Sequence, residues 1–435
     1  MPSTVTRPPL RESPAVLAPR FAALRVRDYR WYFITCLLTM TADSIEHVIS
    51  YWVIFQKFHS PTLGGFAVIS HWLPFLFFSV YVGALADRYD CRKLIQASQA
   101  LFALASVAWG VLMLTDSLEI WHAGGILLIH GVAGVIGVPA TQLILQDMVG
   151  GGQLPSAIRL KASSRYLSIL LGPAVGGGLM LVLGPGWGLL ANVLVYLPLS
   201  LLLLRMPYTG HTQGVEPPRR PRFGLGEALR VFREVRSDQP IVTMIVLAGA
   251  SSFFVGNAFQ AQMPQYAHDL GADDAGVWYS VLLGANAAGA VLGAVLLESL
   301  NVLRPRVRTA ICCAGAWGMT MVLFSAVGSY RLAVALLVLA GILDIAFMSM
   351  AQTLVQVLAP PRLRGRVVGL FNTAVLGLRA GSGVTIGLLG AAISVHWSLA
   401  LSAAALVLTC GGLLAREIGK GPSDDADGPA PAARP

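Results

Sequence analysis

The chain has 435 residues, of which 55% are hydrophobic and only 12% charged, and its formal net charge is +9. So few charged side chains cannot cover a soluble globule of this length, which excludes a soluble fold and indicates a polytopic membrane protein. The basic residues lie in short stretches between apolar runs, without an aromatic-interleaved basic patch, so we expect contact with a lipid bilayer and no binding of nucleic acid.

The absence of several sequence motifs argues against further classes of protein. No G-x-x-x-x-G-K-[ST] loop is present, which disfavours an ATP-driven pump, and the absence of H-E-x-x-H and G-x-S-x-G runs disfavours an enzyme. The five cysteines include no C-x-x-C pair, so the sequence predicts neither a disulfide framework nor a metal site. We therefore expect no cofactor.

Residues 1–30 are rich in Pro and Arg and lack the continuous apolar core of a signal peptide, so we interpret them as a cytoplasmic arm. Apolar runs follow, each near the roughly 20 residues that cross the hydrocarbon core. The sequence predicts an all-α membrane protein with twelve transmembrane helices, near 31–55, 64–86, 94–114, 121–145, 162–184, 187–206, 240–265, 276–299, 309–328, 331–357, 366–391 and 396–415.

The first apolar run carries a polar stripe. Asp43 lies near its middle, and Glu46 and His47 follow three and four residues later, so all three share one helix face. An ionised group at half depth in the membrane is costly, so the stripe must face water or protein. Our hypothesis is that Asp43, supported by Glu46 and His47, is a protonation site coupled to transport. The alternative is that Asp43 pairs within the first group of helices and never titrates.

A short charged turn follows the second run and reads G-A-L-A-D-R-Y-D-C-R-K over residues 83–93. It resembles the G-x-L-A-D-R-x-G-R-K loop between helices 2 and 3 of the major facilitator superfamily, although Asp90 replaces a glycine and Cys91 a base. The resemblance implies two six-helix bundles around a central path. It also implies a cytoplasmic gate at this loop, with Asp87 near the start of helix 11. The motif positions in this chain are Gly83, Asp87, Arg88 and Arg92.

The fourth run contains His130 in H-G-V-A-G, at a place where many proton antiporters of the superfamily have Arg in R-x-x-x-G. A histidine can relay protons, since its ordinary pKa lies near neutrality. The alternative is that His130 simply bonds a neighbouring helix.

The fifth run contains a glycine-rich segment that resembles the G-P-x-x-G-G signature of antiporters in the superfamily, with Ser168 in place of an initial Gly. Its positions are Gly172, Pro173, Gly176 and Gly177. We expect Pro173 to kink the helix and the glycines to let a neighbouring helix approach closely. The resemblance implies an exporter, whereas the alternative is plain close packing.

Residues 207–239 are polar and proline-rich and include an amphipathic piece, so we interpret them as a cytoplasmic linker. The linker joins predicted six-helix bundles at 31–206 and 240–416, and residues 417–435 form a predicted disordered cytoplasmic tail. With this topology nearly all of the 31 Lys and Arg lie on one side of the membrane. The bias of positive charge places both termini in the cytoplasm.

The second half contributes two charges and two amides to the expected substrate cavity. Asp344 in helix 10 and Arg379 in helix 11 lie near half depth, and Asn257 and Gln260 lie in helix 7. A buried guanidinium stays protonated and needs an anion. Arg379 therefore either pairs with Asp344 or Asp43, or meets an acidic group of the substrate.

Asp28-Tyr-Arg at the start of helix 1 and the segment 360–369 before helix 11 resemble the multidrug and siderophore exporter branch of the superfamily. The resemblance implies a monomeric secondary transporter of the inner or plasma membrane that exchanges protons for drugs, siderophores or other amphiphilic small molecules. The alternatives are a proton-linked importer of a small metabolite and a transporter-like sensor that does not transport.

Overall fold

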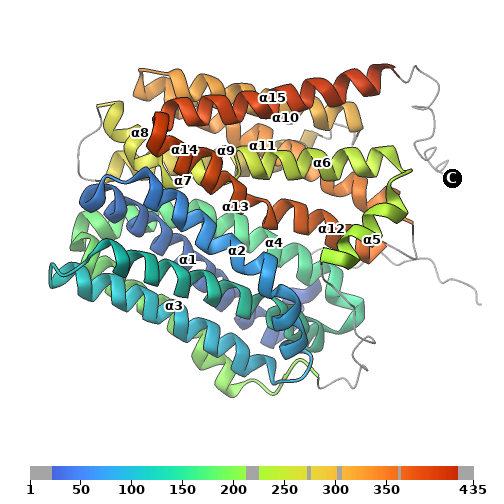
Figure 1. Ribbon diagram of the computed structural model, residues 1–435. Helices are drawn as coiled ribbons and strands as arrows, with labels where there is room; N and C mark the ends of the chain where they lie inside the picture. The colour runs from blue at the N-terminus through green and yellow to red at the C-terminus, as the bar shows by residue number, and fades with distance from the viewer. Residues whose placement is uncertain (1–21, 212–224, 272–275, 301–305, 361–363, 420–435) are drawn as a thin grey trace, which may run out of the picture.

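The computed structural model describes residues 22–211, 225–271, 276–300, 306–360 and 364–419, and every regular element in these ranges is a helix. Figure 1 shows two groups of long helices side by side. The first group comprises η1 (Ala22–Arg25), α1 (Arg27–Phe58), α2 (Pro61–Ala86), α3 (Cys91–Leu114) and α4 (Ile120–Arg205). The amphipathic α5 (Leu225–Val235) precedes the second group.

The second group of helices contains two interrupted spans. Its continuous helices are α9 (Val277–Leu300), α10 (Val307–Ala326), α11 (Tyr330–Leu358) and α15 (Val395–Gly419). The seventh span is divided into α6 (Gln239–Phe254), α7 (Ala258–Ala261) and α8 (Met263–Asp269). The eleventh span is divided into α12 (Arg364–Gly377), α13 (Arg379–Ser382), the π-helix η2 (Gly383–Leu388) and α14 (Leu389–Ile393).

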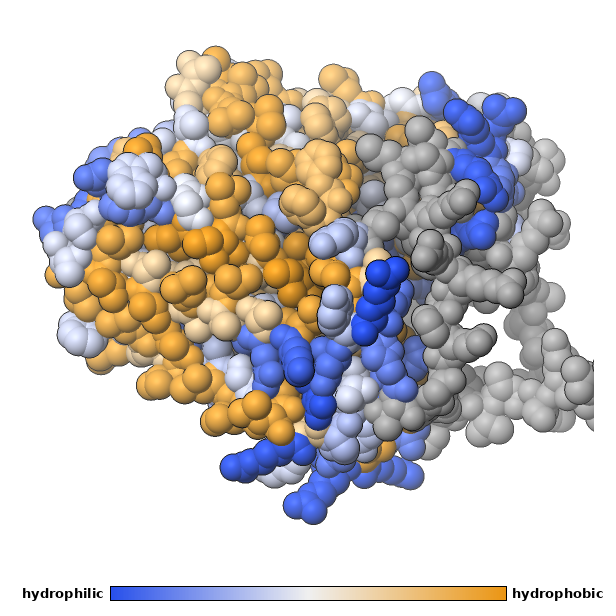
Figure 2. Space-filling view, turned by 60° about the horizontal axis from the view of Figure 1, so that its bottom comes forward, coloured by the Kyte–Doolittle hydropathy of each residue, from blue (hydrophilic) through white to orange (hydrophobic). Residues whose placement is uncertain are grey.

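Ten stretches of the described residues are long and apolar enough to cross a membrane. One of them, Leu167–Arg205, contains two antiparallel helices joined at Gly184, which count as two spans. Helix α1 is not among the ten stretches, although its 32 residues are enough to cross a membrane. Both observations agree with twelve spans, because the polar stripe of α1 lowers its hydropathy. The chain is thus an all-α, multi-pass membrane protein, and the apolar side chains in Figure 2 form a broad band between more polar ends.

The predicted loop between the fourth and fifth spans is absent. Among the described residues of α4 the backbone leaves the helical conformation at Gly150 (φ 67°) and at Gly184 (φ 75°), and at each of them one helix ends and the next begins. Positive φ is accessible to glycine without a steric penalty, so each reversal needs a single residue. Pro173, in contrast, keeps helical dihedral angles, so the helix continues through it, and the expected kink of the helix axis remains a prediction. Residues 151–161 are consequently helical, and the fifth span begins earlier than predicted.

The seventh and eleventh spans also differ from the continuous helices that the sequence predicts. Gly256 adopts a φ of 45° between α6 and α7. A Cβ added at this position would lie 2.6 Å from the hydroxyl oxygen of Ser382. The π-helix η2 widens the eleventh span directly after Ser382. Interruptions of this kind are tolerated at membrane depth where neighbouring helices satisfy the released backbone groups. Thr385 does so here by donating a hydrogen bond to the carbonyl of Phe254 at 2.9 Å.

We call the end of the molecule that carries Met206–His211 and α5 the linker end. The two bundles contact each other at the opposite end, where α2 packs on η2. A Cβ on Gly387 would lie 2.1 Å from the Cα of Gly65, so no side chain fits there. In the described part of the chain, the hydrogen bonds that join the bundles also lie toward this end: Tyr279 donates to the carbonyl of Val48 at 3.0 Å, and Gln262 to that of Pro61 at 2.8 Å.

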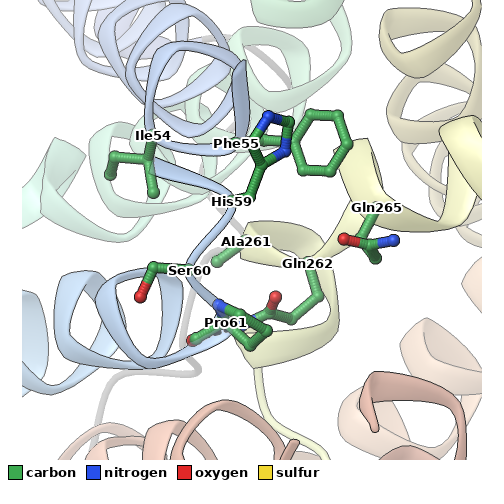
Figure 3. A pocket seen from close by; sticks show the side chains of 8 residues that line it. All are labelled: Ile54, Phe55, His59, Ser60, Pro61, Ala261, Gln262 and Gln265. Atoms are coloured by element: carbon green, nitrogen blue, oxygen red, sulfur yellow. Dashed lines mark hydrogen bonds between the residues drawn. The ribbon is translucent and has the colours of Figure 1, made fainter. Parts of the chain in front are cut away.

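A small pocket lies at this junction. Figure 3 shows Phe55 and His59 at the end of α1 facing Gln262 and Gln265 of the second bundle. The ring of Phe55 also lies 5.7 Å from the ring of His268. Buried apolar side chains of both bundles also pack in one cluster near this junction, in which the rings of Trp52 and Tyr279 stack 5.8 Å apart between centroids.

Close packing inside the first bundle depends on Gly131. A Cβ at this position would lie 1.9 Å from the carbonyl oxygen of Ser70, so α2 and α4 approach backbone to backbone. We expect Gly131→Ala to lower the free energy of unfolding by about 1–3 kcal/mol, because the helices must separate. Thermal unfolding of the purified protein in detergent measures this. Gly125→Ala on the same helix meets no atom within 4 Å and is the matched control; equal stability of the two variants would contradict the prediction.

Candidate functional site

The polar stripe of α1 meets a histidine of α4. Nε2 of His130 lies 3.0 Å from Oδ1 of Asp43, and Nδ1 of the same ring lies 2.7 Å from Oε1 of Glu46. The histidine is 4% exposed and Glu46 is 2% exposed. The sequence singled out these residues separately, and the fold brings them together because α1 packs along α4. Asp43 is thus paired with His130 and not with Arg379.

Glu46 is held from its other side by side chains that the sequence analysis missed. The hydroxyl of Ser106 on α3 donates to Oε2 of Glu46, and Asn192 donates to Ser106 at 3.3 Å. A buried carboxylate needs such partners, since its desolvation is otherwise uncompensated. Single Ser and Asn residues inside apolar runs are common, so no sequence signal distinguishes these two.

Two further histidine rings complete the cluster. Nδ1 of His47 lies 2.8 Å from the carbonyl oxygen of Asp43, and the ring centroid of His47 is 4.7 Å from that of His130. His71 of α2 lies 5.0 Å from His47 and 5.3 Å from His130 between ring centroids, so the three rings form a triangle. The sequence analysis missed His71, although an ionisable side chain inside the run 64–86 was a usable signal.

The second bundle reaches the first through Arg379. Its guanidinium lies over the ring of Trp72 on α2, 4.9 Å from the centroid, which is a cation–π geometry across the bundle junction. Its charge also acts on the half-buried carboxylate of Asp344. Trp72 follows His71 directly, so the charged groups of both bundles converge on one turn of α2.

The two amides of the seventh span contact each other. Asn257 caps α7 and donates to the side-chain oxygen of Gln260 at 3.4 Å. They sit at the break in the span, where α7 packs on α2 and η2. Gln262, two residues after Gln260, donates a hydrogen bond to the carbonyl of Pro61 and so contacts the first bundle.

The charged loop after α2 binds the beginning of the linker. Arg92 donates to both carboxylate oxygens of Asp90, and these hydrogen bonds hold the pKa of Asp90 below its ordinary value. Arg92 also donates to the carbonyl of Met206 at 2.5 Å. Because the pKa of Asp90 is lowered, the ion pair between Arg92 and Asp90 is present at neutral pH and is lost as the pH falls through that pKa.

The expected clasp between Asp87 and helix 11 remains a prediction, because residues 361–363 lie outside the described part. Asp87 is the C-cap of α2, and its backbone N–H donates to the carbonyl of Gly83 at 3.0 Å. Arg88 is exposed. Of the motif residues, Arg92 makes the long-range contact.

We expect Arg92→Ala to speed hydrogen exchange of the backbone amides at 206–211, because both the ion pair and the bond to Met206 disappear. Exchange followed by mass spectrometry measures this, with exposed Lys93→Ala as the control. Unchanged exchange in Arg92→Ala would mean that other contacts, such as that of Gly210 with Asp147, suffice to hold this segment.

The glycines of the antiporter-like segment lie at helix contacts. A Cβ on Gly172 would lie 2.4 Å from Cβ of Ser44, and one on Gly176 would lie 3.1 Å from Val48, so α1 packs directly on this face. A Cβ on Gly177 would meet the hydroxyl of Ser280 at 2.7 Å, which places this residue at the junction with α9 of the second bundle. The segment therefore packs against both bundles.

Comparisons with known proteins agree with this architecture. A family model described as a transmembrane secretion effector matches residues 18–431. The multidrug efflux pump Tap of Mycobacterium tuberculosis is 23% identical over 415 residues, which cover 90% of this chain and 95% of the pump. The enterobactin exporter EntS of Citrobacter koseri is 26% identical over 333 residues, which cover 75% of this chain and 76% of the exporter.

Solved structures show the same fold at low identity. A bacterial homolog of the human lysosomal transporter Spinster, in an inward-facing and unoccupied conformation, has a TM-score of 0.63 and 15% identity, and covers 90% of this chain and 95% of that one. A D-xylose–proton symporter has a TM-score of 0.65 and 14% identity, and covers 90% and 97%. Because the family match spans nearly the whole chain, the chain belongs to the transmembrane secretion effectors of the major facilitator superfamily, and it is a membrane transporter and not an enzyme.

Proposed function

We propose that the chain is a secondary active exporter of the cell membrane, which carries amphiphilic small molecules out of the cytoplasm by alternating access and is driven by the proton gradient. The names of the relatives, a multidrug efflux pump and an enterobactin exporter, support the direction and the class of substrate. The two-bundle fold supports alternating access, since rocking of one bundle against the other exposes a central site to each side in turn.

The observation that carries the proposal is the closed junction between the bundles at the end opposite the linker. Gly65 and Gly387 touch there, and Gln262 bonds to Pro61 across it. The linker end is the basic end of the sequence, so the positive-inside rule assigns it to the cytoplasm and the closed junction to the outside. An exporter must load from the cytoplasm, and closure of the outer side supports the loading step of such a cycle.

We further propose that Asp344 is the carboxylate that carries the coupling proton. In the part of the chain that the structure describes, no hydrogen bond or ion pair within 4 Å is found for Asp344, whereas Asp43 and Glu46 are engaged by His130. The nearby charge of Arg379 acts on Asp344, and Arg379 itself lies over Trp72 of the other bundle. A proton on Asp344 would remove one charge beside Arg379 and thereby change the balance of forces across the junction.

The direct test uses everted membrane vesicles that contain the protein and a lipophilic fluorescent dye as probe. We expect dye to accumulate inside when the vesicle interior is acidified, and accumulation to stop when a protonophore collapses the gradient. Vesicles without the protein are the control. Accumulation only in right-side-out vesicles would indicate an importer, and dye binding without flux would indicate a sensor; either result would overturn the proposal.

A further inference from the structure

We propose that His47, His71 and His130, together with Asp43, bind a transition-metal ion of the Zn²⁺ type inside the first bundle. This inference does not depend on the proposed transport function. The sequence gives no spacing typical of a metal site, because the three histidines come from α1, α2 and α4. Their side chains converge only in the folded bundle.

The three imidazoles already stand near binding distance. Ligand nitrogens of the three rings lie within 4.8 Å of one another. A tetrahedral Zn²⁺ with Zn–N bonds of about 2.0–2.1 Å holds its nitrogens about 3.3 Å apart. Small rotations of the side chains would close this difference. The rings line one small pocket with Glu46, Ser50 and Tyr51.

The second ring nitrogens are arranged as they are around bound metals. A metal-ligating histidine almost always donates its other N–H to a carboxylate or a backbone carbonyl, which fixes the tautomer. Nδ1 of His130 lies 2.7 Å from Glu46, and Nδ1 of His47 lies 2.8 Å from the carbonyl of Asp43. In the tautomers that donate from Nδ1, both Nε2 lone pairs are left for an ion.

Buried polar atoms at the centre of the cluster lack hydrogen-bond partners. Nε2 of His130 and Oδ1 of Asp43 are 3.0 Å apart, yet their orientation makes no hydrogen bond, and Nδ1 of His71 is also unsatisfied. Such atoms are rare in native interiors and call for a specific reason. A cation between them would satisfy all three. The side chain of Asp43 is 34% exposed, which provides a path of entry.

The donor set selects the kind of ion. Three imidazoles and one carboxylate suit Zn²⁺ and Co²⁺, whereas Mg²⁺ and Ca²⁺ require more oxygen ligands. Two positive charges would also balance Asp43 and Glu46 inside the membrane region, where unbalanced charge is costly. A bound ion would tie α1, α2 and α4 together within the first bundle.

The experiment uses the full-length protein purified in detergent without a histidine tag and stripped with a chelator. We expect one equivalent of Zn²⁺ to remain after gel filtration, and Co²⁺ to give the visible absorption bands of a four-coordinate site. His71→Ala and His47→Ala should lose both signals. Glu46→Gln, which alters only the support of His130, should weaken Zn²⁺ binding by about 10–100-fold.

His268→Ala is the matched control, because this histidine is 57% exposed and belongs to the second bundle. It should bind Zn²⁺ like the unaltered protein. Equal binding by His71→Ala, or a Co²⁺ spectrum of the unaltered protein without four-coordinate bands, would overturn the proposal. The spectrum decides the question even if a histidine variant fails to fold. Because no transport is measured, failure of the metal site leaves the proposed export untouched.

Discussion

Asp344→Asn is expected to reduce proton-driven export to the level of vesicles without the protein, while substrate binding persists. Asparagine keeps the size and polarity of the side chain but cannot take up or release a proton. Residue 344 beside Arg379 would then stay uncharged through the cycle, and the proton gradient could no longer bias the junction at Trp72. Dye uptake into vesicles with an acid interior measures the coupled flux, and quenching of dye fluorescence by the purified protein measures binding.

Asp116→Asn is the matched control for the same chemical change. Asp116 is 95% exposed and pairs with Lys57 in the connection between α3 and α4, far along the chain from the candidate site. It should leave gradient-driven uptake unchanged. Full coupling in Asp344→Asn would show that another group carries the proton. Arg379→Ala separates the remaining alternatives by dye binding, because coupled transport is already lost without Asp344: recovery of binding on adding Asp344→Asn supports a charge pair, and no recovery supports a contact with an acidic substrate.

Gly387→Ala should shift the protein away from the conformation that is closed opposite the linker. The added Cβ would lie 2.1 Å from the Cα of Gly65, and backbone atoms cannot move aside as a flexible side chain can. Overpacking of this kind costs about 1–3 kcal/mol. A difference of that size changes a two-state equilibrium by about 5–150-fold. We therefore expect a larger population in which the bundles are separated at this end, and slower turnover.

Nitroxide labels at His59 and His268, in a cysteine-free background, report the separation by pulsed electron resonance, since both side chains lie at the junction and are exposed. The distance distribution should move to longer values in Gly387→Ala. Gly178→Ala on α4 is the control, because a Cβ there meets no atom within 4 Å. An unchanged distribution in Gly387→Ala would show that η2 accommodates the methyl group locally.

The sequence by itself determined the membrane architecture. Apolar runs of about 20 residues must be helices in lipid, because only a helix or a closed barrel satisfies the backbone there. The polar stripe of α1 was also visible, since Asp43, Glu46 and His47 follow helical spacing within one run. The charged turn at 83–93 was enough to identify the superfamily, and the family match confirms this.

Only the tertiary structure decided which polar groups meet. His71 and His130 come from different helices, and no periodicity within one helix states which residue of another helix lies opposite. The helix breaks at Gly256 and in η2 also escaped prediction, because the backbone groups that they release are satisfied by neighbours such as Thr385. Lipid tolerates any apolar face equally, so hydropathy places a helix in the membrane, and packing between helices decides its rotation and its partners.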